Sequence, residues 1–391
     1  MRCIPINSEL NKANRGEAMA DLFEYLDWRA DVPLSVDPFN EVDNLILAEL
    51  AYTDFSGIVP SCGETVSLSA AYESFFQNHS KEELLKETSF TAKAPLLMEK
   101  MLTGSRFQNI RLSMYIDFID EEKTAQISAV TFLLDDETAY VAFRGTDSTV
   151  VGWKEDFELG CLNETTGQQR AVIYLEETAS VFSFPLRVGG HSKGGNFAVY
   201  ASSFCSRPIQ DRIIFVYSND GPGFRREITE MDGYLRILPR IVSIIPDTSM
   251  IGLLLSSRAN HRVVRSSAFG IMQHDGFSWS VRRNHFEKAE LSDLGKLFDQ
   301  TLDSWMDGMD DETRKSFTDT VFSVIESTGM DTFHEMSGKK WKAAEAMITS
   351  LVTIPKEKQS ELLHLAGQLV QSGSHAAMEK LPESLHRKNP K

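Results

Sequence analysis

The most constraining feature of this 391-residue sequence is the pentapeptide GHSKG at residues 190–194, which stands between two different apolar runs. The run before it, residues 185–190, indicates a strand, and the run after it, residues 197–200, indicates the start of a helix. A sharp strand-to-helix turn holds its central serine in a strained conformation, and the flanking glycines avoid collisions across that turn. The pattern predicts that Ser192 is a nucleophile, and the alternative is a purely structural glycine turn.

Short apolar runs recur through the middle of the chain, with helix-length stretches between several of them. Residues 126–145 hold two such runs around an acidic turn, which predicts a β-hairpin. Later runs follow at 185–190, 213–220, 240–247 and 261–266. Strands that alternate with helices predict an α/β fold, in which a mostly parallel sheet is covered by helices on both faces.

The sequence predicts three parts. Residues 1–20 form a polar N-terminal segment, and residues 21–285 form the α/β domain, with a helical cover over residues 64–115. Residues 286–391 show only amphipathic helical patterns, so we expect an all-helical C-terminal extension. This extension either packs on the sheet domain or forms a small domain of its own.

Composition excludes several classes of protein. The formal net charge of −16 argues against a nucleic-acid surface, which needs clustered Lys and Arg. Four cysteines without a CxxC pair suggest neither a zinc site nor a disulfide framework, and they fit a reducing compartment. The chain shows no signal-peptide pattern and no apolar run long enough to span a bilayer. We therefore expect a cytoplasmic protein without a transmembrane segment, and the oligomeric state stays open.

A serine hydroxyl is a weak nucleophile at neutral pH, so the hypothesis requires a histidine base and a carboxylate that orients it. After a nucleophile elbow, the acid and then the histidine are expected further along the chain. Asp247, which ends the later of two strands, is the expected acid. Asp220 is the alternative, although its Gly-Pro neighbours favour a turn former. His274, in a loop-like stretch beyond the last strand, is the expected base.

The reaction also needs N–H donors for the oxyanion that develops, usually one after the nucleophile and one from an earlier loop. Lys193 supplies the first of these. Thr146 is expected to supply the second, because Gly145 permits a tight turn at the end of the preceding strand. The alternative for this segment is a strand-ending turn with Arg144 in a structural ion pair.

Five motifs coincide along the chain and carry a family resemblance. They are AFRGTDSTVVGWKEDF, GHSKGGNFA, FVYSNDGPGF, VSIIPDTSMIG and MQHDGFSW. In this order they resemble the oxyanion loop, nucleophile elbow, following strand, acid loop and histidine loop of lipase class 3-like α/β-hydrolases. The resemblance spans about residues 20–285 and includes an uncharacterised bacterial branch of that group, a domain of unknown function.

The resemblance implies a role for individual residues. Ser192 corresponds to the nucleophile, Asp247 to the acid and His274 to the base. Lys193 and Thr146 correspond to the two oxyanion positions.

Two further segments are expected to contact substrate. The resemblance implies a lid after the oxyanion threonine, with Trp153 at its centre. The apolar residues that follow the expected acid, Met250, Ile251 and Leu254, are candidates to line an acyl pocket. Plain core packing is the alternative for both segments.

The residues and the resemblance together predict a serine hydrolase that cleaves carboxylic acyl esters, in the manner of a lipase or esterase. Its substrate would be a small-molecule or lipid acyl ester, and no metal or cofactor is implied. A thioesterase or an amidase could use the same triad. From another class, the fold could serve as a non-catalytic scaffold that binds a protein partner.

Overall fold

The computed structural model describes residues 20–86, 90–120, 125–146, 159, 162, 164–293 and 295–296. These residues include a sheet of eight strands whose spatial order follows the order of the chain. The strands are β1 (Val66–Ser67), β2 (Arg111–Asp120), β3 (Ala125–Leu133), β4 (Ala139–Phe143), β5 (Leu186–His191), β6 (Ile213–Asn219), β7 (Ile241–Pro246) and β8 (His261–Val264). Strands β1 to β4 pair antiparallel, whereas β4 to β8 run parallel to one another.

The connections explain this change of direction. β3 and β4 form the predicted hairpin, because the acidic turn between them is short enough to reverse the chain. Each parallel pair from β4 to β7 is instead joined by a longer crossover that contains helices. These helices are α7 (Thr166–Val181), α8 (Lys193–Phe204), α9 (Arg207–Gln210), α10 (Arg226–Thr229), α11 (Asp232–Ile237) and the 3₁₀ turn η2 (Leu238–Arg240).

Both faces of the sheet are buried against helices, and strand β4 shows how. Ala139, Val141 and Phe143 belong to one apolar core, while the intervening Tyr140 and Ala142 belong to the other. Successive side chains of a strand point to opposite faces, so one apolar strand serves both cores.

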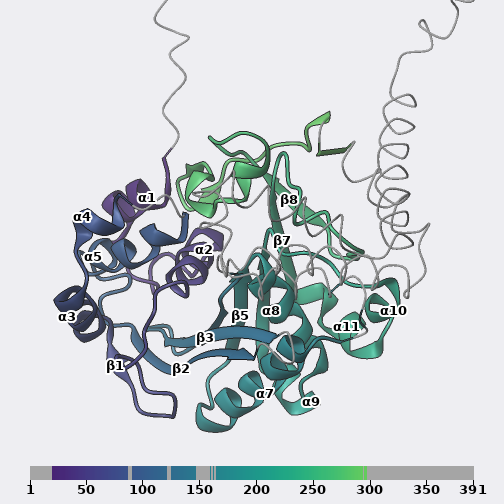
Figure 1. Cartoon of the computed structure of the whole chain (residues 1–391), viewed down its shortest axis with the longest axis horizontal. Helices are drawn as coiled ribbons and strands as arrows, with labels where there is room; N and C mark the ends of the chain where they lie inside the picture. Colours follow the sequence, from purple (N-terminus) through teal and green to yellow (C-terminus); the bar gives the residue numbers. More distant parts are fainter. Residues whose placement is uncertain are drawn as a thin grey trace, which may run out of the picture.

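The helices divide between the two faces (Figure 1). The first face is covered by the N-terminal helices α1 (Leu22–Arg29), α2 (Glu41–Leu50), α3 (Leu68–Asn78) and α5 (Leu97–Met101), with α4 (Lys81–Leu84) and η1 (Phe90–Leu96) beside them. The second face is covered by α7, α8 and α11. The predicted α/β class is therefore confirmed, with a mostly parallel sheet between two helical layers.

The later part of the chain folds over the ends of β7 and β8. It contains the 3₁₀ turns η3 (Gly270–His274) and η4 (Gly276–Ser278), then the short hairpin β9 (Val281–Arg282) and β10 (His285–Phe286). Trp279 and Phe286 from this part are buried in the same core as helices α1 and α2. The first core is thus closed by segments from both ends of the described chain.

Two predicted boundaries need correction. Helices α3, α4 and α5 lie within the expected helical cover at 64–115. The same range also contains strand β1 and the first residues of strand β2, which begins at Arg111. The sheet domain also continues beyond residue 285, because the Ala289 N–H donates to the Val263 carbonyl at 2.9 Å. Apart from residues 286–293 and 295–296, the C-terminal extension expected at 286–391 lies outside the described residues, as does the expected polar segment apart from Ala20.

Among the described residues, no helix has the length and apolar character needed to cross a bilayer.

Candidate active site

Ser192 lies at the sharp turn between β5 and α8, where the sequence places it. Its backbone has φ of 59° and ψ of −133°, a strained conformation for a residue with a side chain. A Cβ at Gly190 would collide with backbone atoms of Gly194 and with the Phe143 carbonyl, so this turn requires glycine. The strained serine, the strand before it and the helix after it together form a nucleophile elbow.

A buried amide pair supports the elbow from the neighbouring strand. Asn219, at the end of β6, accepts the Ser192 N–H at 2.9 Å through its carbonyl and donates through Nδ2 to the Gly190 carbonyl at 3.0 Å. Asn44 of α2 donates to Asn219 Oδ1 at 2.8 Å, and its own Oδ1 accepts the Tyr140 hydroxyl at 2.7 Å. Because these groups are buried and paired, they fix the elbow relative to both β6 and α2.

His274 pairs with Asp220, the residue that follows β6. The distance from His274 Nδ1 to Asp220 Oδ2 is 2.6 Å, and Asp220 is fully buried. Asp220 Oδ1 accepts the Ser249 hydroxyl at 2.5 Å and the Gly252 N–H at 3.1 Å. A carboxylate acceptor at Nδ1 fixes the proton on that nitrogen and leaves His274 Nε2 as an acceptor. This is the orientation that a general base requires.

Asp247 has a different set of partners. Its Oδ1 accepts Gln273 Nε2 at 2.9 Å, and Gln273 Oε1 accepts the Thr248 N–H at 2.7 Å. His274 therefore contacts Asp220 and not Asp247, which corrects the expectation that Asp247 orients the histidine. The reason is strand order: β6 lies directly beside the strand that carries the serine, and β7 lies one strand further away.

A second histidine lies between the elbow and the base. The His191 and His274 rings are 4.6 Å apart between centroids, and His191 Nε2 lies 2.7 Å from the His274 carbonyl. His191 Nδ1 lies 3.0 Å from the Tyr52 hydroxyl. Burial lowers the pKa of His191 to about 3, so its ring is neutral at neutral pH.

The contact between His191 and Glu49 is not an ion pair, although Nδ1 and Oε1 are 3.8 Å apart. Burial raises the pKa of the Glu49 carboxyl well above its usual range, and the charge of Asp275 raises it further. His191 is therefore neutral at neutral pH, and the shift at Glu49 favours its uncharged form. Glu49 Oε1 is buried without a hydrogen-bond partner in the described part of the chain, which is the environment that favours the uncharged form.

The nucleophile and the base are neighbours through His191. Between Ser192 and His274, both described, the structure shows no hydrogen bond, and the link runs through the His191 side chain and backbone. Catalytic hydrogen bonds of this kind commonly tighten only when substrate binds. The site thus brings together a serine, a histidine and a carboxylate, with Asp220 in the place expected for Asp247.

The two expected oxyanion donors lie on either side of the elbow. Lys193 is the first residue of α8, and N–H groups in a first helical turn point out of the helix N-terminus. Thr146 follows Gly145, whose backbone lies against the Ser192 Cβ. Arg144 also pairs with Asp117 at 3.0 Å, so the structural ion pair considered for this segment is present as well.

The expected acyl-contact residues are only partly described. Met250, Ile251 and Leu254 lie half-buried in the loop after β7, which carries the Ser249 and Gly252 donors to Asp220. Trp153 and the rest of the expected lid lie outside the described residues. The part played by these side chains in substrate binding stays a prediction.

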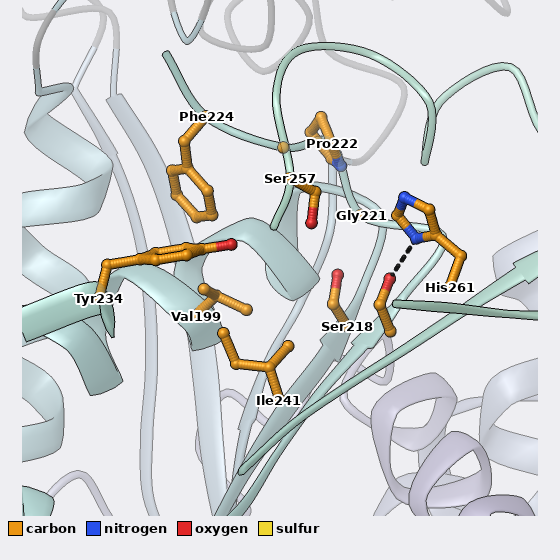
Figure 2. Close-up of a pocket in the computed structure, with 11 residues that line it drawn as sticks. Val199, Ser218, Gly221, Pro222, Phe224, Tyr234, Ile241, Ser257 and His261 are labelled. Carbon is orange, nitrogen blue, oxygen red and sulfur yellow. Dashed lines mark hydrogen bonds between the residues drawn. The ribbon is translucent and has the colours of Figure 1, made fainter. Parts of the chain in front are cut away.

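A small cavity lies beside residues 221–223, which follow Asp220, and it is bordered by helices α8 and α11 (Figure 2). Its polar wall includes Ser218, Ser257 and His261, and His261 Nδ1 lies 2.8 Å from the Ser243 hydroxyl. Its apolar wall includes Val199, Phe224, Tyr234 and Ile241. Among the described residues expected to contact an acyl chain, Met250, Ile251 and Leu254 do not line it.

The described residues contain no group of three or more His, Cys, Asp or Glu side chains placed to hold a metal ion.

A strained serine at a strand-to-helix turn, beside a histidine and carboxylate pair on a mostly parallel sheet, is the arrangement of a lipase-like α/β-hydrolase fold. A family model agrees with this class: the Mbeg1-like model matches residues 101–323, and the chain belongs to that family. The family is lipase class 3-like, so the resemblance to that group holds at the level of fold. No curated protein matches the chain.

Solved structures similar to this chain include three lipases. The native Rhizomucor miehei lipase propeptide complex is 11% identical, with 60% of this chain and 78% of that chain covered and a TM-score of 0.38. The M37 lipase is 15% identical, with 45% and 70% covered and a TM-score of 0.32. The Lip2 lipase from Yarrowia lipolytica is 12% identical, with 48% and 73% covered and a TM-score of 0.30.

The sequence indicates some residues of this site only weakly and others not at all. Asp220 is its second candidate for the acid, because the glycine and proline after it also fit a plain turn. Asp220 is in fact both, since its φ of 48° belongs to a tight turn and its carboxylate faces His274. Tyr52 and Glu49 gave no signal, because they lie about 140 residues before the histidine that they contact.

Proposed function

We propose that this chain is a serine hydrolase that cleaves carboxylic acyl esters through an acyl-enzyme. The observation that carries the proposal is the His274–Asp220 pair at 2.6 Å beside a serine held at φ of 59°. A structural turn has no need of an oriented histidine, whereas serine activation requires one.

The proposed reaction assigns one role to each group. Ser192 Oγ attacks the acyl carbonyl carbon while His274 Nε2 takes its proton, and Asp220 stabilises the imidazolium that forms. The N–H groups of Lys193 and Thr146 stabilise the oxyanion. The C–O bond to the alcohol then breaks as His274 returns the proton to the leaving oxygen. Water, deprotonated by His274, releases the acid and restores Ser192.

The finer details are also proposals. Met250, Ile251, Leu254 and Trp153 are proposed to contact the acyl chain of a small-molecule or lipid ester. A cytoplasmic location and membership of the bacterial branch remain predictions from the sequence. Thioesters and amides pass through the same kind of tetrahedral intermediate, so a panel of nitrophenyl esters, acyl thioesters and amides would rank the substrate classes.

The nucleophile is tested by labelling the full chain with a fluorophosphonate probe and mapping the modified peptide by mass spectrometry. We expect one adduct, on Ser192, and no labelling of the Ser192→Ala variant. Ser218→Ala is the matched control, because Ser218 is a buried serine at the end of the adjacent strand and should leave labelling intact. Equal labelling of wild type and Ser192→Ala would refute the assignment.

A further inference from the structure

His191, the residue directly before the nucleophile, also contacts the base. Its Nε2 lies 2.7 Å from the main-chain carbonyl of His274, and a carbonyl can only accept, so Nε2 carries the proton. Its ring packs on the His274 ring, with centroids 4.6 Å apart. One side chain thus joins the two residues that the proposed reaction must keep at a fixed separation.

We propose that His191 is a positioning residue for His274, and that the Tyr52 hydroxyl supports the tautomer this requires by donating to His191 Nδ1. The inference rests on the proposed function for its catalytic consequence. The hydrogen-bond arrangement itself is independent of any activity.

The tautomer follows from the partners of the two ring nitrogens. A neutral imidazole with its proton on Nε2 has an acceptor at Nδ1, and the Tyr52 hydroxyl at 3.0 Å donates to that acceptor. The Tyr52 hydroxyl is itself held in place, because it lies against the backbone of Gly145, where a Cβ would collide with it. Glu49 Oε1 lies 3.8 Å from Nδ1, and burial raises the pKa of this carboxyl, which disfavours a charge beside the ring.

The base needs such an anchor because it lies on an exposed turn. In η3 and just before it, Phe269 is 86% exposed and Met272 is 53% exposed, so little packing restrains this segment from outside. On the inner side, the His274 carbonyl is held by His191, and the Gln273 carbonyl accepts Trp279 Nε1 at 2.9 Å. A displacement of about 1 Å at a reacting group can cost about 100-fold in rate.

The first test replaces the donor selectively. A Gln side chain can place its amide N–H near the position of His Nε2, whereas an Asn side chain is too short. We expect His191→Asn to lower the rate constant of fluorophosphonate labelling, and kcat for a nitrophenyl ester, by about 10-fold to 100-fold with little change in KM. His191→Gln should recover most of that loss. Equal losses in both variants, at matched melting temperatures, would overturn the positioning role.

The second test reads the tautomer by ¹⁵N NMR of histidine-labelled full-length protein, and it needs no activity. We expect the His191 ring to stay neutral between pH 5 and 8, because burial holds its pKa at about 3, with the proton on Nε2. Tyr52→Phe removes the donor to Nδ1 but leaves the His274 carbonyl at Nε2, so the proton should stay on Nε2 while the Nδ1 resonance moves toward that of an acceptor without a hydrogen bond. A proton on Nδ1 in the wild type, or an Nδ1 resonance unchanged in Tyr52→Phe, would refute the arrangement.

The two tests separate the failure of this inference from the failure of the proposed function. If the wild type takes no probe and cleaves no ester, the proposed function fails, and the NMR result alone decides whether the arrangement of His191 exists. If the wild type is active but His191→Gln rescues nothing, the function stands and the positioning role is wrong.

Discussion

Asp220 and Asp247 follow adjacent parallel strands, yet the structure gives them different tasks. Asp220 is fully buried and accepts hydrogen bonds from His274, Ser249 and Gly252, whereas Asp247 is only half-buried and accepts from Gln273 and Thr248. Two consecutive residues of one turn, Gln273 and His274, thus bind two consecutive strand ends. In this fold the carboxylate that binds His274 follows the strand beside that of the nucleophile, and the carboxylate one strand further away binds Gln273 instead.

A third carboxyl near the same turn extends the comparison. Glu49 is as buried as Asp220 but has no hydrogen-bond donor at Oε1 within the described residues, and burial raises its pKa well above the usual range. Its neighbours include Asp275, His191 and Tyr52. Donors, rather than burial alone, therefore distinguish a carboxylate suited to orient a histidine from one that stays protonated.

The largest expected effect separates the two aspartates. Asp220→Asn keeps the shape of the side chain but can no longer hold the proton on His274 Nδ1 through a charged acceptor. We expect esterase kcat/KM and the rate constant of labelling to fall by on the order of 10³ to 10⁴. Asp247→Asn is the matched control, since an amide oxygen still accepts from Gln273, and it should cost less than about 10-fold.

The same pair of variants can also break the comparison. If Asp247→Asn lost as much activity as Asp220→Asn while both proteins kept the melting temperature of the wild type, Asp247 would have to be the functional acid. The expectation from the sequence would then replace the one from the structure.

A smaller effect is expected from Glu49→Gln, measured as melting temperature against pH. The unfolded chain releases the Glu49 proton near its ordinary pKa of 4.5, but the folded state retains it to a higher pH. The associated stability is therefore complete below pH 4.5 and is lost as pH rises through the folded pKa. Gln cannot titrate, so above that pH the variant should melt at a higher temperature than the wild type.

At low pH the two melting temperatures should converge, because Glu49 is protonated in both the folded and the unfolded chain. Glu41→Gln serves as the control on the same helix, since Glu41 is an α2 carboxyl that accepts from the exposed Arg262 side chain and from the Phe286 N–H. Parallel curves for Glu49→Gln and the wild type across the whole pH range would show that Glu49 is not protonated when folded.

Much of the fold could be predicted from local patterns. The four apolar runs after residue 180 correspond to β5 to β8. Parallel strands are buried on both faces, so they appear as continuous apolar stretches of sequence. The elbow was predictable too, since Gly190 is required by its close approach to Gly194, although Gly194 itself lies against Phe143 and Arg144 at the end of β4. By contrast, the helical cover expected at 64–115 includes residues 111–115, although these belong to β2, which pairs along most of its length with β3.

The site was less predictable, because its partners are chosen by tertiary geometry. Ser192 and His274 could be proposed from motif order, but the choice between Asp220 and Asp247 depends on which strand lies beside β5. That order is fixed by the packing of the whole sheet and not by the residues around either aspartate. The contacts of Tyr52 and Glu49 with His191 depend on where helix α2 lies on the sheet, and no local pattern reports this.

The most direct test of the central claim is a crystal structure of the full chain after reaction with a phosphonate inhibitor. We predict phosphorus bonded to Ser192 Oγ, His274 Nε2 within hydrogen-bond distance of the phosphonate or the serine oxygen, and Asp220 at His274 Nδ1. An adduct on another residue, or a His274 ring turned toward Asp247, would contradict the account.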